Sequence, residues 1–357
     1  MKIGLVRRGY SRTGGAEAYL RRFAEAATEV GHSIVLFSER WPVEEWSFEL
    51  VRVDSKSPGT FADAMIALRP RDRCDFVFSL ERLHTCDAYR AGDGVHAAWL
   101  ELRKKFEPPW KGWFRRFSGK HREILALEKE LFGPRGARAV IANSALIREE
   151  IVQHFQYPQA QIQVIHNGVP PFHVPPDARA HTRASLGLKD DDFAILFAGS
   201  GWSRKGLRFA IEAMNEAKLD HAALLVAGRG NHRAMPKSPY TRFLGPVKDM
   251  PPLLAAADAF ILPTIYDPFS NACLEALAAG LPVITSAQNG FSEIIESGLE
   301  GEIIEEPNDI PALATAIKSW SDPDRRAIAK LRLETLGARY TIAENVRHTL
   351  NAIQALR

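Results

Sequence analysis

The chain has 357 residues, of which 46% are hydrophobic and 25% charged, and its formal net charge is +3. This chain is longer than a protein with one ordinary hydrophobic core, so we predict two domains. The composition is typical of a globular protein, and so small a net charge indicates no particular partner. Cys74, Cys86 and Cys273 form no CxxC pair, no signal-peptide core follows Met1, and no apolar run approaches the ~20 residues of a membrane span. We therefore expect a cytoplasmic protein with reduced thiols, which excludes a disulfide framework.

Short apolar runs alternate with helix-sized segments through the first 170 residues. Gly31 closes a predicted helix over residues 16–30, and Ser144 is a suitable cap for the helix that follows the fourth strand. The strands predicted here cover residues 2–6, 33–38, 76–80, 139–143 and 163–169. A segment with four prolines, residues 170–177, then predicts an interdomain linker.

The same alternation restarts after the linker. Strands are predicted at residues 194–200, 222–228, 259–264 and 282–286, and helices at about 310–335 and 341–356. Runs that are hydrophobic on both faces and alternate with helices predict parallel sheets covered on both sides. The predicted fold class is therefore α/β, with two doubly wound, Rossmann-like domains facing a central cleft. They cover residues 1–170 and 171–340, and a helix at about 341–357 can pack back on the first domain.

Residues 267–284, DPFSNACLEALAAGLPVI, are the most informative stretch of the chain. Asp267 lies in a loop after a predicted strand, Asn271 is expected to cap the next helix, Glu275 to lie in its first turn, and Gly280 to end it. Ligands bind at the carboxyl ends of strands in open α/β sheets, and a helix N-terminus favours anions. Acids beside such amides indicate a ligand that carries sugar hydroxyls as well as phosphate.

Two glycine-rich loops add to this prediction. Gly14 and Gly15 precede the first helix and allow a ligand to approach the backbone closely, although a plain glycine turn without a ligand is the alternative. The loop lacks the GxGxxG motif, so only Glu39 supports a nicotinamide site. In GSGWSRKGL, residues 199–207, adjacent cations suit a diphosphate, although a solvated cationic loop has the same composition. GxxxxGK is absent, so this is no P-loop.

Other segments have weaker signals. Gly228, in the turn GRGN, is a candidate neighbour of a base or ribose. His84 and His96 flank Asp93, and the sequence leaves open whether they are catalytic or ordinary loop histidines. The acidic run 190–192 is interpreted as a solvated turn rather than a metal site, and no histidine spacing indicates zinc.

Cations and aromatic residues are interleaved over residues 99–122, where eight Lys or Arg accompany two Glu. This pattern fits a surface that docks on anionic lipid headgroups or a phosphorylated acceptor. Single-stranded nucleic acid and a merely solvated face are the alternatives. The residues selected for acceptor or membrane contact are Arg103, Lys104, Arg115 and Arg116.

The motifs together resemble a known family. Residues 267–284 are similar to the EPFGxxxLEAMAAGxPVI signature of retaining glycosyltransferases of family 4, which have the two-domain GT-B fold. The GG loop, the VIHNGV segment and a GxxxxRKG loop occur in the same order as in that family. A finer likeness, to bacterial lipopolysaccharide core α-glucosyltransferases, is carried by TGGAEAY, AYRAGDGVHAAW and SRKG.

The resemblance implies roles for individual residues. Glu275 would accept hydrogen bonds from the ribose hydroxyls of a nucleotide sugar, while Arg204 and Lys205 would hold the diphosphate and stabilise the leaving group. Asp267 stands where the family usually has the longer Glu, and would contact the transferred sugar. The remaining implied contributors are Asp93 near the reacting carbon and the donor-binding residues Gly14, Gly15, Gly228, Asn271 and Ala272.

The activity implied by the resemblance is retaining transfer of a hexose from a UDP-sugar to a lipopolysaccharide-core or related glycan, and the finer likeness implies that the hexose is glucose. The nucleotide sugar is a co-substrate, and no cofactor, metal or nucleic-acid partner is expected. The expected location is the cytoplasm, with peripheral contact with the inner face of the cell membrane. GDP and ADP donors stay open, as do two other interpretations: a GT-B UDP-sugar 2-epimerase and a non-catalytic nucleotide-sugar-binding protein.

Overall fold

The computed structural model describes residues 1–10, 15–107 and 119–356. The chain divides into two units, which are described separately. Unit 1 consists of Met1–His166 together with Ile342–Arg357, and unit 2 of Asn167–Thr341. Among the described residues, no helix is long and apolar enough to cross a membrane.

The core of unit 1 is a parallel sheet whose described strands number seven, in the order β3-β2-β1-β4-β5-β6-β7. The direction of winding reverses between β1 and β4, which are neighbours with Ile3 opposite Phe76. The strands are β1 (Lys2–Val6), β2 (Ser33–Ser38), β3 (Glu49–Arg52), β4 (Phe76–Ser79), β5 (Cys86–Arg90), β6 (Ala137–Ala142) and β7 (Ile162–Val164).

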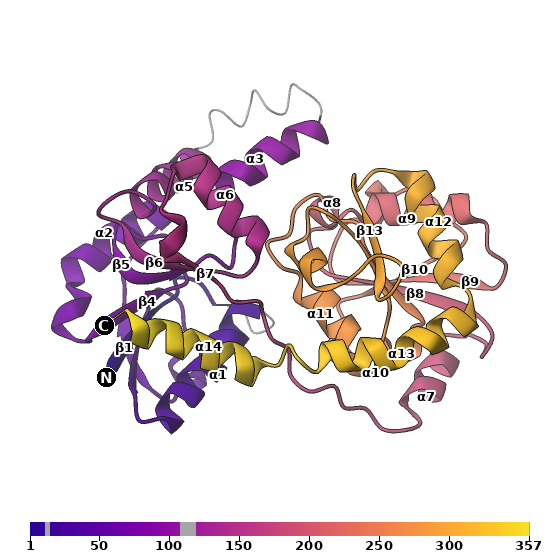
Figure 1. Cartoon of the computed structure of the whole chain (residues 1–357), viewed down its shortest axis with the longest axis horizontal. Coiled ribbons are helices and arrows are strands. Elements are labelled where there is room, and N and C mark those ends of the chain that lie inside the picture. Colours follow the sequence, from indigo (N-terminus) through magenta and orange to yellow (C-terminus); the bar gives the residue numbers. More distant parts are fainter. Residues whose placement is uncertain (11–14, 108–118, 357) are drawn as a thin grey trace. The chain divides into compact units, whose positions relative to one another are not determined.

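Helices cover both faces of this sheet (Figure 1). They are α1 (Gly15–Glu29), α2 (Pro58–Leu68), α3 (His96–Lys105), α5 (Gly119–Leu131), α6 (Ala145–Phe155) and α14 (Ile342–Ala355). The last of these returns to unit 1 and packs beside α1, where buried Val346 and Ile353 join Phe23 in one hydrophobic core. As predicted, Ser144 caps α6 by accepting a hydrogen bond from the Ile147 amide at 3.2 Å.

Unit 2 is built around a second parallel sheet, with the order β10-β9-β8-β11-β12-β13 among its described strands. These are β8 (Phe193–Ala198), β9 (Ala222–Ala227), β10 (Thr241–Gly245), β11 (Ala259–Leu262), β12 (Val283–Ser286) and β13 (Gly301–Ile304). Every residue of β8, β11 and β12 is buried, as expected for strands covered on both faces.

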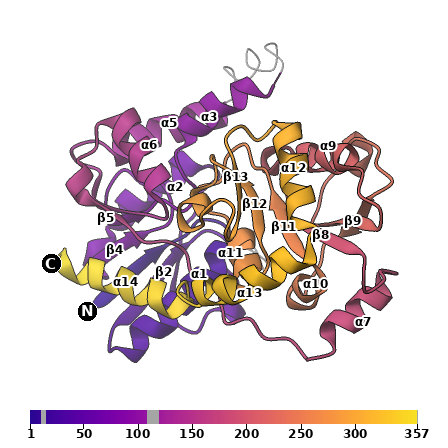
Figure 2. The same ribbon diagram turned by 45° about the vertical axis from the view of Figure 1, so that its right-hand side comes forward.

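Helices α9 (Leu207–Ala217) and α12 (Ile310–Trp320) pack together on one face of this sheet, and α11 (Asn271–Ala278) and α13 (Pro323–Gly337) on the other (Figure 2). Unit 2 also contains α7 (Ala178–Ser185), α8 (Trp202–Lys205) and α10 (Pro251–Ala256). Its first and last segments lie side by side, because the Val169 amide donates to the Tyr340 carbonyl at 2.9 Å and Val169 pairs with Thr341.

The predicted fold class of two Rossmann-like α/β units is confirmed, but some elements differ from the prediction. The strand expected over 163–169 ends at Val164, and the single helix expected over 310–335 is two helices. The break follows from Pro323 and from Asp322, whose side chain caps α13. Strands β3, β5, β10 and β13 were not predicted.

Candidate functional site

The candidate site lies at the carboxyl edge of the sheet of unit 2. Strands β8 and β11 are neighbours, but the chain continues from β8 toward β9 and from β11 toward β12, in opposite directions. Such a reversal leaves a crevice between the loops that follow the two strands, which is where open α/β sheets bind ligands. Here these loops are residues 199–206 and 263–270.

The loop after β8 brings two cations to this crevice. Arg204 and Lys205 lie on α8, a single turn between Gly201 and Gly206, which both have a φ of +74°. At Gly206 a Cβ atom would lie 1.8 Å from the Pro263 carbonyl oxygen, so only glycine allows the two loops to approach this closely.

Arg204 is fastened to the loop after β11 by three hydrogen bonds. Its carbonyl oxygen accepts from the Ile265 amide at 2.8 Å and from the Thr264 hydroxyl at 2.9 Å. Its guanidinium donates through Nη1 to the Tyr266 carbonyl at 2.8 Å. One guanidinium nitrogen is thereby fixed, and the direction of the whole planar group is set with it.

Lys205 forms an ion pair with Asp267. The two side chains are 13% and 8% exposed, so the pair is largely shielded from solvent. The sequence predicted that Asp267 lies near helix amides suited to bind phosphate, although an unpaired carboxylate there would repel the phosphate. The structure resolves this conflict, because the Lys205 ammonium balances the charge of the Asp267 carboxylate.

The start of α11 differs from the prediction in two respects. Ser270, not Asn271, is the cap, since its hydroxyl accepts from the Cys273 amide at 3.4 Å, whereas the Asn271 side chain accepts from Asn167 Nδ2 at 2.7 Å. Glu275 is therefore in the second turn rather than the first, and it is half-buried. The amides of Asn271 and Ala272, at the first two helical positions, have no acceptor among the described residues, as is usual at a helix N-terminus.

Asn289, after β12, supports this helix start and was missed from the sequence. It is fully buried; its Oδ1 accepts from the amides of Ser270 and Phe291 at 3.1 and 3.2 Å, and its Nδ2 donates to Thr285 Oγ1 at 2.9 Å. The Asp267 amide also donates to the Gln288 carbonyl at 3.0 Å. The available signal was the Asn-Gly pair shortly after a strand, which predicts a turn but not a support for the neighbouring loop.

The glycine turn after β9 is explained by packing within unit 2. Gly228 has a φ of +128°, and a Cβ there would lie 2.0 Å from the Gly199 carbonyl oxygen. A Cβ on Gly230 would lie 2.2 Å from the indole ring of Trp202. Glycine is thus required at both positions whether or not a ligand binds there.

In unit 1, Asp93 follows β5 and belongs to a charged cluster at the carboxyl edge of the sheet. Its carboxylate lies 3.8 Å from Arg7 Nη1, and its side chain is 58% exposed. Arg7 also contacts Glu81 at 3.1 Å and Glu17 at 3.3 Å. Burial raises the pKa of Glu81; burial lowers the pKa of Arg7, but Glu81, Asp93 and Glu17 outweigh this and raise it overall. Arg7 was not predicted as a site residue; its only signal in the sequence was its position directly after β1.

The two histidines near Asp93 have partners within unit 1. His96 Nε2 lies 3.0 Å from His121 Nδ1, and burial, together with the positive charge of Arg82 and the neighbouring His121, lowers its pKa to about 4. His84 contacts Asp63 at 2.9 Å and Glu130; burial lowers its pKa, but these carboxylates raise it overall. Both arrangements favour structural histidines.

The other selected residues are only partly described. Gly15 is the first residue of α1, while Gly14, Arg115 and Arg116 lie outside the described residues. Arg103 and Lys104 lie in the last turn of α3, where Arg103 donates to Glu107 at 2.5 Å and Lys104 is exposed. Over the part of the chain that the structure describes, no group of three His, Cys, Asp or Glu residues could hold a metal ion.

Comparison with known families matches both units. The model described as "Glycosyltransferase Family 4" matches residues 13–171, and the model described as "Glycosyl transferases group 1" matches residues 192–322. The lipopolysaccharide glucosyltransferase WaaG of Escherichia coli is 24% identical over 94% of this chain and 90% of its own length. The uncharacterized glycosyltransferase MJ1607 of Methanocaldococcus jannaschii is 33% identical over 45% of each chain, so this match spans less than half of that relative.

Solved structures show the same fold. The crystal structure of WaaG superposes with a TM-score of 0.83 at 21% identity, covering 98% of this chain and 99% of that one. Anabaena Alr3699/HepE, in complex with UDP and glucose, superposes with a TM-score of 0.73 at 18% identity over 99% and 100% of the two chains.

Proposed function

Because the chain belongs to the glycosyltransferases of family 4, we propose that it moves a hexose from a nucleoside diphosphate sugar to a glycan acceptor with retention of configuration. Unit 2 binds the donor in this proposal, and unit 1 serves the acceptor. The observation that supports it most directly is the convergence of Arg204, Lys205 and the N-terminus of α11 at the β8/β11 reversal.

The charges at this crevice suit a diphosphate that becomes a leaving group. Breaking the bond from the anomeric carbon to oxygen leaves negative charge on the diphosphate. Preorganised cations and helix amides stabilise such charge without any reorganisation during the reaction. The guanidinium of Arg204 is already oriented by the Tyr266 carbonyl, and the amides of Asn271 and Ala272 supply donors. In this proposal the reaction needs no metal.

The carboxylates take the hydroxyl-bearing parts of the donor. Glu275 accepts hydrogen bonds from the ribose, and Asp267 contacts the transferred sugar while its charge stays balanced by Lys205. Asp93 near the reacting carbon, and the backbone of Gly14, Gly15 and Gly228 at the donor, complete the proposed set. The acceptor hydroxyl attacks the anomeric carbon, and its proton passes to the departing phosphate oxygen.

Relatives support a particular donor and acceptor. HepE was solved with UDP and glucose, and WaaG is a lipopolysaccharide glucosyltransferase, so we propose a UDP-hexose donor, with glucose preferred, and a lipopolysaccharide-core or related glycan acceptor. The epimerase and the non-catalytic binding protein are not favoured, because WaaG, which matches 94% of this chain, is a glucosyltransferase.

We further propose that the protein works in the cytoplasm and can contact the inner membrane face through Arg103, Lys104, Arg115 and Arg116. Support comes from the basic, aromatic composition of residues 99–122. Neutralising the four residues should reduce salt-sensitive binding to anionic vesicles, and unchanged binding would remove membrane contact from the proposal.

The decisive experiment offers a panel of nucleotide sugars with truncated lipopolysaccharide and follows product mass. We expect a hexose added to the acceptor, with Glu275→Ala weakening nucleotide affinity and Lys205→Ala lowering kcat more than affinity. Release of free nucleotide with an isomerised sugar and no acceptor would indicate the epimerase instead. Binding of the donor without turnover on any acceptor would indicate the binding protein.

A further inference from the structure

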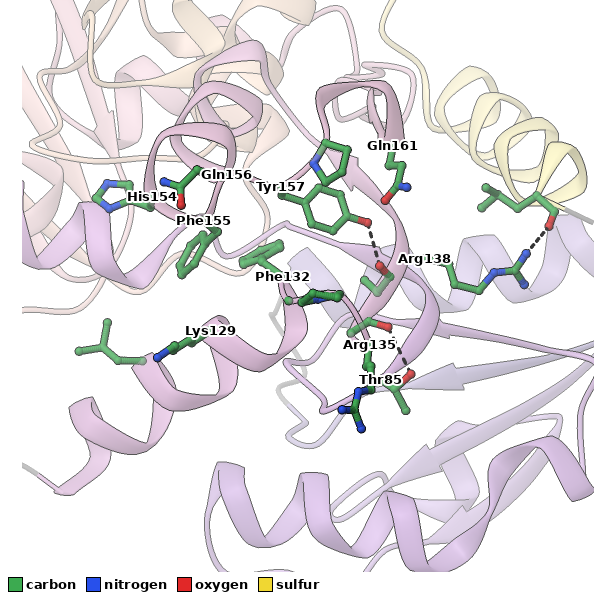
Figure 3. A pocket seen from close by; sticks show the side chains of 17 residues that line it. Thr85, Lys129, Phe132, Arg135, Arg138, His154, Phe155, Gln156, Tyr157 and Gln161 are labelled. Atoms are coloured by element: carbon green, nitrogen blue, oxygen red, sulfur yellow. Dashed lines mark hydrogen bonds between the residues drawn. The ribbon is translucent and has the colours of Figure 1, made fainter.

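A cavity lies wholly within unit 1, whereas the candidate site belongs to unit 2. It has a volume of about 1200 Å³ and is lined by the last turns of α5 and α6, the turn over residues 133–136, the start of β6 and Leu356 (Figure 3). These elements meet at the amino end of β6, whereas Asp93 follows the carboxyl end of the neighbouring β5. The cavity is therefore at the opposite edge of the sheet from Asp93.

The lining is positively charged. Seventeen residues line the cavity, and they include Lys129, Arg135 and Arg138 but no Asp or Glu. Arg138 shares the buried carboxylate of Asp87 with a second arginine, so one positive charge remains unbalanced there. Lys129 and Arg135 are exposed, and neither has an ion-pair partner among the described residues.

Aromatic rings form the centre of the lining. Phe132 lies 4.8 Å from Phe155 and 5.9 Å from Tyr157, measured between ring centroids. Phe132 and Tyr157 are buried and Phe155 is half-buried, while the Tyr157 hydroxyl donates to the Ala137 carbonyl at 2.8 Å. In the view of Figure 3, Lys129 and Arg135 lie on one side of these rings, and His154 and Gln156 on the other. The rings are thus held in place with Phe155 accessible.

Gln156 has a backbone conformation that is unusual for its residue type. It ends α6 with a φ of +50°, in the left-handed region where glycine is the usual residue. Its side chain lines the cavity, and its Nε2 donates to the Gln153 carbonyl at 3.2 Å, which leaves Oε1 as an acceptor. Gln161 is a second amide in the lining. Amides can donate to and accept from sugar hydroxyls.

We propose that this cavity binds a phosphorylated saccharide, at a site separate from the transfer reaction. Lys129 would bind the phosphate through charge-assisted hydrogen bonds, and Arg135 would add to the positive potential of the lining. The ring of Phe155 would pack on the apolar face of the sugar, and Gln156 would bind its hydroxyls. Two sources share this chemistry: a phosphorylated glycan chain and a free sugar phosphate. The inference does not depend on the identity of the donor or on turnover.

Calorimetry on the full-length protein tests the proposal with glucose 6-phosphate, glucose and inorganic phosphate as probes. We expect glucose 6-phosphate to bind more tightly than either of the other two. The Lys129→Ala/Arg135→Ala variant should lose about tenfold or more in affinity, since the loss of one charged contact to the phosphate removes on the order of a tenfold factor. The matched control, Lys56→Ala/Arg73→Ala, removes two exposed cations of unit 1 that do not line the cavity, and should bind as the unmodified chain does.

Gln156→Gly separates a ligand role from a structural one. Glycine suits the positive φ, so the variant should unfold at the same temperature as the unmodified chain or higher, while its affinity for glucose 6-phosphate falls. Unchanged affinity in both Lys129→Ala/Arg135→Ala and Gln156→Gly would overturn the proposal. So would inorganic phosphate binding as tightly as glucose 6-phosphate, or no binding of any phosphorylated probe.

The two sources are distinguished by adding a phosphorylated oligosaccharide released from lipopolysaccharide. Binding that is at least tenfold tighter than that of glucose 6-phosphate supports the glycan chain as the occupant. Equal affinity supports the free sugar phosphate. Transfer to an unphosphorylated acceptor should be unchanged in Lys129→Ala/Arg135→Ala, because these residues lie outside the transfer site.

Discussion

Separating Lys205 from Asp267 should loosen the loop after β11 before it unfolds unit 2. Two opposite charges about 4 Å apart attract each other by about 4 kcal/mol at an effective dielectric constant of 20. The side chains are only 13% and 8% exposed, so either single replacement, Lys205→Ala or Asp267→Asn, leaves a poorly solvated partner and should cost about 3 kcal/mol of local stability. The double variant should cost less than the two single costs added, with a coupling of about 2 kcal/mol or more.

The appropriate assay is hydrogen exchange followed by mass spectrometry. Within residues 263–270, the Ile265 amide donates to Arg204 and the Asp267 amide to Gln288, so their exchange reports opening of this loop. Urea unfolding alone would combine the unfolding signals of the two units, because a chain with two units need not unfold in one step. Asp267→Glu, which keeps the charge, is the matched control and should retain most of the protection.

A coupling below about 0.5 kcal/mol would refute this reasoning, since it would equal that of an ordinary exposed pair. Faster exchange in Asp267→Glu than in Asp267→Asn would refute it as well, because the geometry of the side chain and not its charge would then hold the loop.

Three further predictions follow from single positions. Gly206→Ala should destabilise unit 2 by more than about 2 kcal/mol and weaken nucleotide binding, since the added methyl group would clash with the Pro263 carbonyl. Urea unfolding and calorimetry would measure the two effects, and an unchanged variant would contradict the close approach of the two loops. Asn289→Ala should cost about 2–4 kcal/mol by leaving buried amides unpaired, with faster exchange at the start of α11. The His96 pKa is lowered to about 4, so as the pH falls the unfolded state takes up a proton first, and stability should fall between pH 6.5 and pH 4. The full shift corresponds to about 2 kcal/mol at pH 5, and solvent screening of the partly exposed ring reduces this to about 1 kcal/mol. His96→Asn should flatten the decline by that amount, as measured by urea unfolding at each pH; an equal slope would contradict it.

The interior strands could be predicted from the sequence because burial on both faces leaves a short apolar run. Strands β8, β9 and β11 were predicted within one or two residues. Strands β3, β10 and β13 lie at sheet edges, where one side is solvated and polar residues interrupt the run, so the apolar signal fails. Strand β5 is interior but contains Asp87, whose charge is balanced by Arg71 and Arg138 from distant segments.

The candidate site could be located from the sequence, but its internal contacts could not. Strand ends and glycines predicted which loops meet, because all parallel strands open at one edge. The pairing of Lys205 with Asp267 depends on side-chain directions, and no local pattern contains that information. Asn289 was missed for the same reason, since the Ser270 amide that it binds lies 19 residues away in the chain.

The pairing of Val169 with Tyr340 and Thr341 has a practical consequence for protein engineering. Unit 2 is one continuous stretch whose two ends are already adjacent, so it can be excised, or transplanted into a relative, with both junctions at a single spot. Unit 1 has no such freedom: a version stopped before Ile342 would strip α1 of the helix beside it and leave Phe23 and its neighbours open to water. Chimaeras that test whether unit 2 carries the proposed donor specificity should therefore exchange residues 167–341 and leave the rest of the chain intact.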